Sequence, residues 1–243
     1  MEQRILTITA QRRLTKDVWE MRLAGDAAGC DVPGRFVNIR LDGFYLRRPI
    51  SVCDWRDGEL TLVYKVVGGG TAAMAALPAG ARLDVLTGLG NGYDTAPSGD
   101  RPLLIGGGVG VPPLYGLCKR LIAEGKTPRV ILGFNTADEI FYEEEFRALG
   151  VEVTVTTVDG SYGVKGFVTD APEIADGTYF YTCGPEPMLK AVYRATACSG
   201  QFSFEERMGC GFGACMGCSC KTVTGYKRIC KDGPVLTKEE IVW

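Results

Sequence analysis

The hydrophobic pattern of this chain changes its period once, near residues 96–100, and this change limits what the chain can fold into. Before it, apolar and polar residues alternate in short stretches at residues 37–41, 60–67 and 81–85. A period of two with closely spaced turns predicts an antiparallel sheet that closes into a small barrel. One helix-like insert, residues 71–77, follows three glycines. We therefore expect residues 1–97 to form a β-barrel domain.

Beyond the turn segment, short apolar runs alternate with segments of helical period. Strands are predicted at residues 103–105, 129–134, 151–158 and 179–182. Helices are predicted at residues 114–122, 138–149 and 186–198. Strands that alternate with helices indicate a parallel sheet with helices on its faces. Residues 98–200 are therefore predicted to form an α/β domain.

The composition excludes several classes of protein. Hydrophobic residues make up 46% and charged residues 23% of the chain, which is ordinary for a globular protein. The 27 basic and 29 acidic residues leave no broad positive surface for a nucleic acid. No apolar run approaches the roughly 20 residues of a membrane span, and the first ten residues have no signal-peptide core. We expect a cytoplasmic protein that binds neither nucleic acid nor membrane.

The absence of histidine narrows the chemistry further. The chain has no His, which excludes Ser-His-Asp triads, His-bound zinc and His-bound haem. It has ten Cys, and five of them lie between residues 210 and 230. Residues 201–243 are rich in Cys and Gly with little periodicity, so apolar burial alone can hardly pack them. A metal or cluster is the expected cross-link.

The spacing of these cysteines favours an iron–sulfur cluster. Cys210, Cys215 and Cys218 follow the pattern C-x4-C-x2-C, and Cys230 lies twelve residues further on. This is the spacing of plant-type [2Fe–2S] sites, in which a distant Cys completes four thiolates. The glycines between them allow backbone amides to point at sulfur. The sequence therefore predicts a small C-terminal [2Fe–2S] domain at residues 201–243.

Two other interpretations of the cysteines stay open at this point. Structural zinc usually shows paired C-x2-C knuckles, and only one such pair exists here. Disulfides are not expected in a reducing compartment. Cys220 lies two residues beyond Cys218 and is interpreted as a bystander, because plant-type spacing does not use it.

A glycine-rich turn in the second region indicates a dinucleotide site. Residues 103–113 read as a strand, a turn and a helix that opens with proline, and the turn holds Gly106, Gly107, Gly108 and Gly110. Such a turn lets a pyrophosphate approach the backbone at a helix N-terminus. A tight strand-to-helix turn is the alternative interpretation.

A second loop supports the same assignment. Cys183, Gly184 and Pro185 follow another short strand at its carboxyl end, where ligands of open α/β sheets bind. A thiol there can lie beside a nicotinamide ring, and a buried free Cys is the alternative. Residues 135–139 contain no Arg or Lys for a 2′-phosphate, so NADH is expected over NADPH.

The barrel sequence carries groups that suit a flavin. Arg48 can bind a pyrophosphate bidentately, and the helix predicted from Thr71 offers N–H donors to the same group. Tyr64 offers an aromatic face, and Gly70 precedes the helix. Separately, each has an ordinary structural interpretation. Their occurrence before a nicotinamide-type loop favours a flavin.

These motifs occur in the same order as in the ferredoxin–NADP reductase superfamily. More closely, the whole chain resembles the electron-transfer subunits of NAD-dependent dihydroorotate dehydrogenase B. The resemblance is carried by RPIS at 48–51, GT at 70–71, LGNG at 89–92, the loop at 106–113, CGP at 183–185, SYGVKGFVTD at 161–170 and the Cys tail.

The resemblance implies an FAD-binding barrel, an NAD-binding domain and a cluster domain. It implies that FAD is contacted by Arg48, Pro49, Ile50, Ser51, Val63, Tyr64, Lys65, Gly70 and Thr71. It also implies that Cys210, Cys215, Cys218 and Cys230 hold the cluster. The implied partner is an FMN-containing catalytic subunit that oxidises dihydroorotate in pyrimidine biosynthesis, assembled with this chain as a heterotetramer.

Electron counting sets the order of these cofactors. NAD exchanges two electrons as a hydride, a cluster exchanges one, and a flavin can do both, so FAD is expected between NAD and the cluster. No side-chain acid or base is needed, and no catalytic residue is assigned.

Two alternative functions stay open. One is the reductase subunit of another NAD(P)H-linked complex: a ferredoxin–NADP oxidoreductase, a sulfhydrogenase or a sulfite reductase. The other is a redox-sensing binding module in which the cluster controls partner association.

Overall fold

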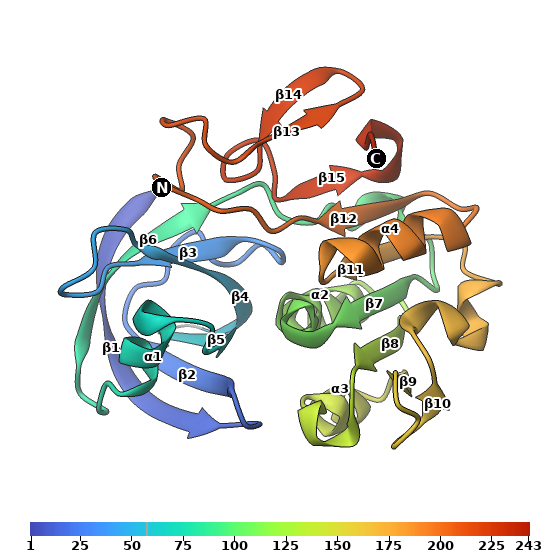
Figure 1. The fold of residues 1–243 in the computed structure, drawn as a ribbon, viewed down its shortest axis with the longest axis horizontal. Coiled ribbons are helices and arrows are strands. Elements are labelled where there is room, and N and C mark those ends of the chain that lie inside the picture. The colour runs from blue at the N-terminus through green and yellow to red at the C-terminus, as the bar shows by residue number, and fades with distance from the viewer. Residues whose placement is uncertain (57) are drawn as a thin grey trace.

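The first part of the chain forms a closed antiparallel barrel (Figure 1). The computed structural model describes residues 1–56 and 58–243. The barrel strands are β1 (Glu2–Arg13), β2 (Val18–Ala24), β3 (Phe36–Ile39), β4 (Arg48–Arg56), β5 (Glu59–Lys65) and β6 (Arg82–Leu89). Their order is β1-β2-β5-β4-β3-β6, and β1 pairs with β6 to close the ring. The predicted barrel is confirmed.

Alternating side chains explain the closure. Along β6, Leu83, Val85 and Leu89 are buried, while Arg82 is exposed. Leu83 and Val85 meet Leu6 and Leu62 from other strands in one core. The helix α1 (Gly69–Ala75) follows β5 and covers this core with the buried Met74.

The second part is a parallel sheet with helices on both faces. Its strands are β7 (Leu103–Gly107), β8 (Arg129–Phe134), β9 (Glu152–Thr157), β10 (Val164–Lys165), β11 (Phe180–Cys183), β12 (Gly200–Ser203) and β15 (Val235–Thr237). Its helices are α2 (Val111–Ala123), α3 (Glu143–Ala148) and α4 (Glu186–Ala195). Short 3₁₀ turns lie at Ala96–Ser98, Gly108–Gly110, Ala137–Glu139, Val168–Asp170, Pro172–Ile174 and Lys238–Glu240. The strand order is β10-β9-β8-β7-β11-β12-β15, and all pairs are parallel except β12 with β15.

The helix predicted at residues 138–149 was wrong in its first half. Tyr142 has a φ of 66°, in the left-handed region, and α3 begins only after it. The buried Tyr142 hydroxyl donates to Glu20 Oε2 of the barrel at 3.0 Å. This contact across the domains accounts for the break, because a continuous helix would direct the side chain elsewhere.

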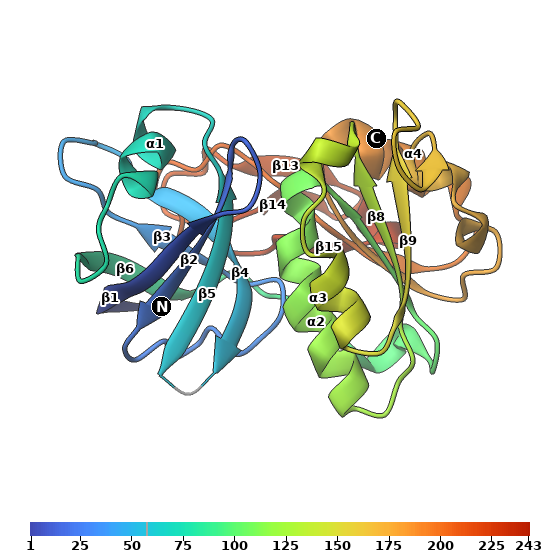
Figure 2. The same cartoon turned by 90° about the horizontal axis from the view of Figure 1, so that it is seen from below.

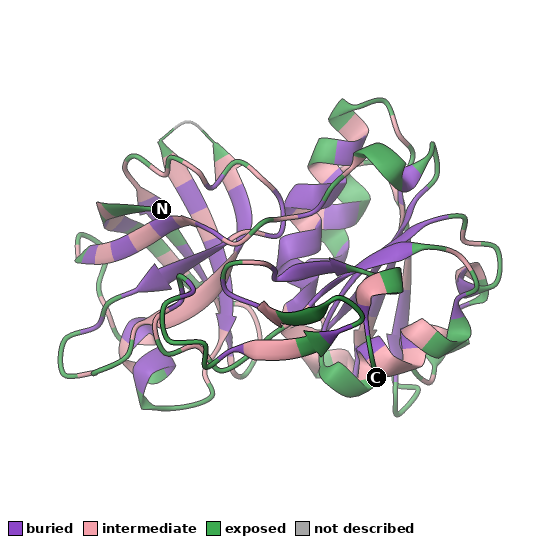
Figure 3. Cartoon of the chain, turned by 90° about the horizontal axis from the view of Figure 1, so that it is seen from above, coloured by how far each residue is buried: buried purple, intermediate pink, exposed green. Residues whose placement is uncertain are grey.

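The tail is not a separate body. Its strands β12 and β15 complete the sheet of the α/β domain, so the predicted boundary at residue 200 falls inside β12. Between them, β13 (Ser219–Thr222) and β14 (Gly225–Arg228) form a two-stranded hairpin. In Figure 3 this hairpin is mostly exposed or intermediate, whereas the sheet strands beneath it are buried.

Helix α2 joins the two domains. It packs against β4, and a Cβ added at Gly116 would lie 2.7 Å from the Trp55 ring and 2.8 Å from the Cys53 carbonyl. Figure 2 shows α2 between the barrel and the sheet, with α4 on the other face. Lys119 Nζ lies 2.5 Å from Asp54 Oδ1 across the same interface. In the described ranges, no helix has both the length and the apolar character needed to cross a bilayer.

Candidate functional site

A cavity of about 330 Å³ lies between the barrel and the strand that leads into the tail, and we call it the interdomain cavity. Eight of the nine residues predicted to contact a flavin line it: Arg48, Pro49, Ile50, Ser51, Val63, Tyr64, Lys65 and Thr71. They come from β4, β5 and the start of α1, which the barrel pairing brings together. The ninth, Gly70, lies directly against Arg48.

Gly70 makes room for the Arg48 guanidinium. A Cβ at Gly70 would lie only 2.0 Å from Arg48 Nε, so any other residue would displace the arginine. The guanidinium carbon also lies 4.9 Å from the centre of the Phe44 ring, within cation–π range. Arg48 is thereby held at the rim of the cavity, where its charge can meet an anionic group.

The hydroxyl groups of the lining residues Tyr64 and Thr71 have hydrogen-bond partners within the protein. The Tyr64 hydroxyl donates to Gln11 Oε1 at 2.8 Å, and burial raises the pKa of Tyr64 above its ordinary value. The Thr71 hydroxyl oxygen accepts from the backbone N–H of Val67 at 3.0 Å. Tyr64 therefore stays neutral and presents a planar, uncharged surface at any physiological pH.

The opposite wall comes from residues that the sequence patterns did not single out. They lie at the end of β12 and just after it: Ser203, Phe204, Glu205, Glu206 and Met208. The pairing of β12 with β11 places them beside the barrel. Phe36, Val67, Val109 and Pro234 complete the lining.

The glycine-rich turn packs closely against its neighbours. A Cβ at Gly110 would lie 2.2 Å from the Cys183 carbonyl oxygen, and one at Gly107 would lie 2.4 Å from Met188 Sδ. A Cβ at Gly106 would lie 3.0 Å from the Val111 side chain of α2. Gly108, with a φ of +50°, has open space where a side chain would be. Of the four predicted glycines, three serve close packing and Gly108 alone borders open space.

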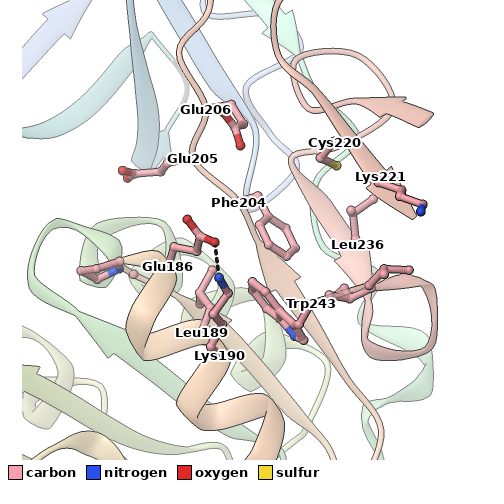
Figure 4. Close-up of a pocket in the computed structure, with 14 residues that line it drawn as sticks. Glu186, Leu189, Lys190, Phe204, Glu205, Glu206, Cys220, Lys221, Leu236 and Trp243 are labelled. Carbon is pink, nitrogen blue, oxygen red and sulfur yellow. Dashed lines mark ion pairs between the residues drawn. The ribbon is translucent and has the colours of Figure 1, made fainter. Parts of the chain in front are cut away.

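A second cavity, of about 360 Å³, begins at the predicted loop of residues 183–185, and we call it the tail cavity (Figure 4). Gly184 and Pro185 line it, together with side chains of α4, the segment after β12 and the C-terminal residues. Glu186 and Lys190 form an ion pair at 2.7 Å on its wall. Phe204, Glu205 and Glu206 line both cavities, so this segment separates them.

Cys183 is buried beneath this loop. Burial raises the pKa of its thiol well above the ordinary value, so the group is neutral at physiological pH. It is the last residue of β11, and its carbonyl group packs against the turn at Gly110. The thiol is therefore a small apolar surface rather than a nucleophile.

The carboxyl ends of β8 and β9 carry a cluster of acidic groups. Glu139 Oε2 accepts from Asn135 Nδ2 at 2.8 Å, and Asp159 Oδ1 accepts from the Ser161 hydroxyl at 2.6 Å. The Ser161 contacts lower the pKa of Asp159, which is therefore ionised. The Ser161 hydroxyl oxygen in turn accepts from the Ala137 N–H at 2.8 Å, which joins the two loops.

The four predicted ligand cysteines lie in one lobe as two pairs. The Cys210 sulfur accepts from the backbone N–H of Ala214 at 3.2 Å and of Cys215 at 3.5 Å. The Cys218 sulfur accepts from the Cys230 N–H at 3.4 Å. Across residues 1–56 and 58–243, no three thiol or carboxylate groups converge on one point. The lobe therefore brings the four thiols near one another as two pairs.

The electrostatics of this lobe favour thiolate at its exposed end. Desolvation opposes ionisation of Cys210, but the N–H groups of Cys215, Phe212 and Ala214 outweigh it and lower the pKa to about 6. At Cys230, burial and the neighbouring Cys218 raise the pKa to about 12. Cys220 lies on β13 and lines the tail cavity instead.

Comparisons with known proteins agree with this architecture. The family model of the iron–sulfur cluster binding domain of dihydroorotate dehydrogenase B matches residues 205–242. The oxidoreductase NAD-binding domain matches residues 104–194. The chain is 43% identical to the dihydroorotate dehydrogenase B (NAD⁺) electron transfer subunit of Fusobacterium nucleatum, over 97% of this chain and 96% of the relative. It is 44% identical to the corresponding subunit of Geobacillus thermodenitrificans, over 98% and 97%.

Solved structures show the same fold. A structure of the NADH-dependent reduced ferredoxin–NADP oxidoreductase matches with a TM-score of 0.89 and 30% identity, over 98% of this chain and 90% of that one. Amycolatopsis cytochrome P450 reductase matches with a TM-score of 0.67 and 25% identity, over 79% and 65%.

Proposed function

Because the chain belongs to the family of dihydroorotate dehydrogenase B (NAD⁺) electron transfer subunits, we propose that it carries electrons between NAD and a separate FMN-containing subunit that oxidises dihydroorotate. FAD and a [2Fe–2S] cluster are its cofactors in this role, in pyrimidine biosynthesis. We assign FAD to residues 1–97, NAD to residues 98–200 and the cluster to residues 201–243. We also propose that it works in the cytoplasm and assembles with its partner as a heterotetramer.

The observation that carries the proposal is the position of residues 203–206, the end of β12 and the segment after it. They line the interdomain cavity, continue into the lobe that holds the four cysteines, and border the tail cavity beside Gly184. The three predicted cofactor regions therefore meet along one segment. A chain that passes electrons between them needs this arrangement.

The residues of the interdomain cavity suit a flavin. Arg48 at the rim can neutralise a pyrophosphate, while Val63, Tyr64 and Ile50 offer a flat and mostly apolar surface for a ring system. Bound FAD would accept a hydride from NADH and release electrons singly. The protein's part is to orient the ring and to keep nearby side chains neutral, as burial does for Tyr64 and Cys183.

The four thiols suit an iron–sulfur cluster. Backbone N–H groups already donate to the Cys210 and Cys218 sulfurs, which favours bound thiolate and lessens its negative charge. The assignment of Cys210, Cys215, Cys218 and Cys230 as ligands remains our proposal. Cys220 is not among the proposed ligands, because it lies on β13 and lines the tail cavity.

The dinucleotide assignment rests on the open face at Gly108 and on the loop at residues 183–185. The backbone at Gly108 is open, and the long helix α2 begins just beyond it. Asp159 and Glu139 at the neighbouring strand ends would repel a 2′-phosphate, so we propose NADH as the electron carrier.

The proposal predicts a division of labour between subunits. The purified chain loaded with FAD and cluster should reduce artificial electron acceptors with NADH and should not oxidise dihydroorotate. Turnover of dihydroorotate by this chain alone would contradict the proposal. A negligible NADH-dependent rate would instead favour a redox-sensing module.

The likeness to the NADH-dependent reduced ferredoxin–NADP oxidoreductase structure favours one second candidate, a reductase subunit of another NAD(P)H-linked complex. The identity of the co-purified partner separates the two. An FMN-containing partner that oxidises dihydroorotate supports the first proposal, and a partner that lacks this activity supports the second.

A further inference from the structure

We propose that two asparagines of the barrel domain, Asn38 and Asn91, are positioning residues that hold the cluster segment against the flavin barrel. Asn38 binds the segment at the first proposed ligand, Cys210, and Asn91 binds it just beyond the last one, Cys230. The inference rests on the ligand set and flavin site proposed above, and it assigns a role to the LGNG motif at residues 89–92.

Asn38 reaches the cluster segment from strand β3 of the barrel. It lies on β3, is almost fully buried, and donates from Nδ2 to the Cys210 carbonyl at 3.2 Å. The approach is close, because a Cβ at Gly211, where φ is +79°, would lie 2.4 Å from the same Nδ2. Glycine at position 211 is therefore required for this contact.

Asn91 holds the other end. Its Nδ2 donates to the Val235 carbonyl at 2.7 Å, and its Oδ1 accepts from the Val235 N–H at 3.1 Å. Its own backbone N–H donates to the Gly233 carbonyl at 2.7 Å. The side-chain amide and the backbone N–H of Asn91 thus bond to Val235 and Gly233, which lie five and three residues beyond Cys230.

The two asparagines belong to one rigid unit. Asn38 pairs with Leu86 of β6, and Asn91 follows two residues after that strand ends. On its other side β3 pairs with β4, so that Asn38 faces Pro49 of the flavin cavity. Hydrogen bonds and strand pairing therefore run without a gap from the flavin cavity to both ends of the cluster segment.

The side chain of Asn38 has an energetic cost that a residue kept only for stability would avoid. Within the described residues its Oδ1 is buried without a hydrogen-bond partner. A leucine of similar shape would remove this unsatisfied acceptor together with the hydrogen bond to the Cys210 carbonyl. If Asn38 served stability alone, these two effects would oppose each other, and Asn38→Leu would change the free energy of unfolding little.

The test compares Asn38→Leu and Asn91→Ala with Gln201→Leu in the full chain loaded with FAD and cluster. Gln201 is a matched control, since it is a buried amide that bonds the Asp94 carbonyl and the Tyr179 hydroxyl and lines neither cavity. Stopped-flow spectroscopy measures flavin reduction by NADH and then cluster reduction. Electron paramagnetic resonance records the reduced cluster and its midpoint potential.

We expect NADH to reduce the flavin at the wild-type rate in both asparagine variants. Electron transfer from flavin to cluster should slow about 10-fold or more, on the scale of other changes around metal ligands, and the cluster spectrum should shift. The Gln201→Leu chain should show neither effect.

Wild-type cluster reduction and an unchanged cluster spectrum in both variants would overturn the inference. So would loss of FAD together with the cluster, because the amides would then support the barrel itself. If Asn38→Leu does not fold, Asn91→Ala decides by the same readouts. Absence of iron and sulfide from the wild-type chain would instead refute the proposed ligand set.

Discussion

At the scale of single residues, the account depends on which cysteines differ in environment. Cys210 receives backbone N–H donors, whereas Cys220 lies on β13 and lines the tail cavity. The spacing predicts that Cys220 is a bystander, because only the first, second, third and fifth tail cysteines fit the plant-type pattern, and this ligand set stays a prediction. What the spacing could not predict was the grouping into two pairs, which depends on how the hairpin β13–β14 folds back.

Cys210→Ser should remove the cluster, and Cys220→Ser should retain it. Serine is a poor ligand for iron, while Cys220 has no proposed role in the site. Iron and acid-labile sulfide, assayed after anaerobic reconstitution, should each be about two per chain in the wild type and in Cys220→Ser. Equal losses in the two variants would contradict the ligand assignment.

Asp159→Asn should increase the use of NADPH relative to NADH. It removes a carboxylate that is ionised at neutral pH and would repel a 2′-phosphate. The ratio of kcat/KM for the two dinucleotides should shift by about 10-fold. Asp176→Asn is the control, since Asp176 pairs with Arg129 at the amino end of β8, away from the carboxyl ends of the strands. A ratio that stays at its wild-type value in Asp159→Asn would refute this role.

At the scale of elements, packing between two loops explains the glycine-rich turn. The sequence predicted a turn open to a pyrophosphate, and the structure shows that three of its glycines also admit the loop after β11. Local pattern cannot reveal this second role, because residues 107 and 188 are distant in sequence. The same limit explains the misplaced start of α3, which is set by the contact of Tyr142 with the barrel.

Gly110→Ala should destabilise the chain and weaken dinucleotide binding. The new methyl group would lie 2.2 Å from the Cys183 carbonyl, so the loop of residues 183–188 must move. We expect a loss of about 1–3 kcal/mol in the free energy of unfolding, measured by denaturant titration. Gly177→Ala is the matched control, because its nearest neighbour would lie at an ordinary 3.6 Å. Equal stability of the two variants would refute the packing role of Gly110.

At the scale of the whole molecule, long-range pairing decided what the sequence could and could not predict. The barrel and the parallel sheet followed from periodicity. The short strands β12 and β15 did not, since strands of four and three residues carry no period of their own. Because β12 places residues 203–206 beside the two cavities, sequence patterns could not predict the wall opposite the predicted flavin residues.

The interface between barrel and sheet should respond to acid. Burial opposes ionisation of Glu20, but hydrogen bonds from Arg12 and Tyr142 outweigh it and lower the pKa of Glu20 below 4.5. A carboxyl with a lowered pKa stabilises the fold at neutral pH and loses that effect as pH falls through its folded pKa.

Glu20→Gln should therefore lose about 1–2 kcal/mol of unfolding free energy at pH 7 and progressively less as the pH falls through the lowered pKa of Glu20, so its acid limb should be flatter. Denaturant titrations across this range measure the difference. A constant loss at every pH would show that ionisation of Glu20 is not involved.

The central claim is that NADH electrons reach a cluster held by the tail through a flavin held by the barrel. Anaerobic NADH added to the loaded chain should bleach the flavin absorbance and produce the paramagnetic signal of a reduced [2Fe–2S] cluster. In Cys218→Ser the flavin should still bleach, and the signal should be absent. Flavin bleaching in the wild-type chain without any cluster signal would contradict the account.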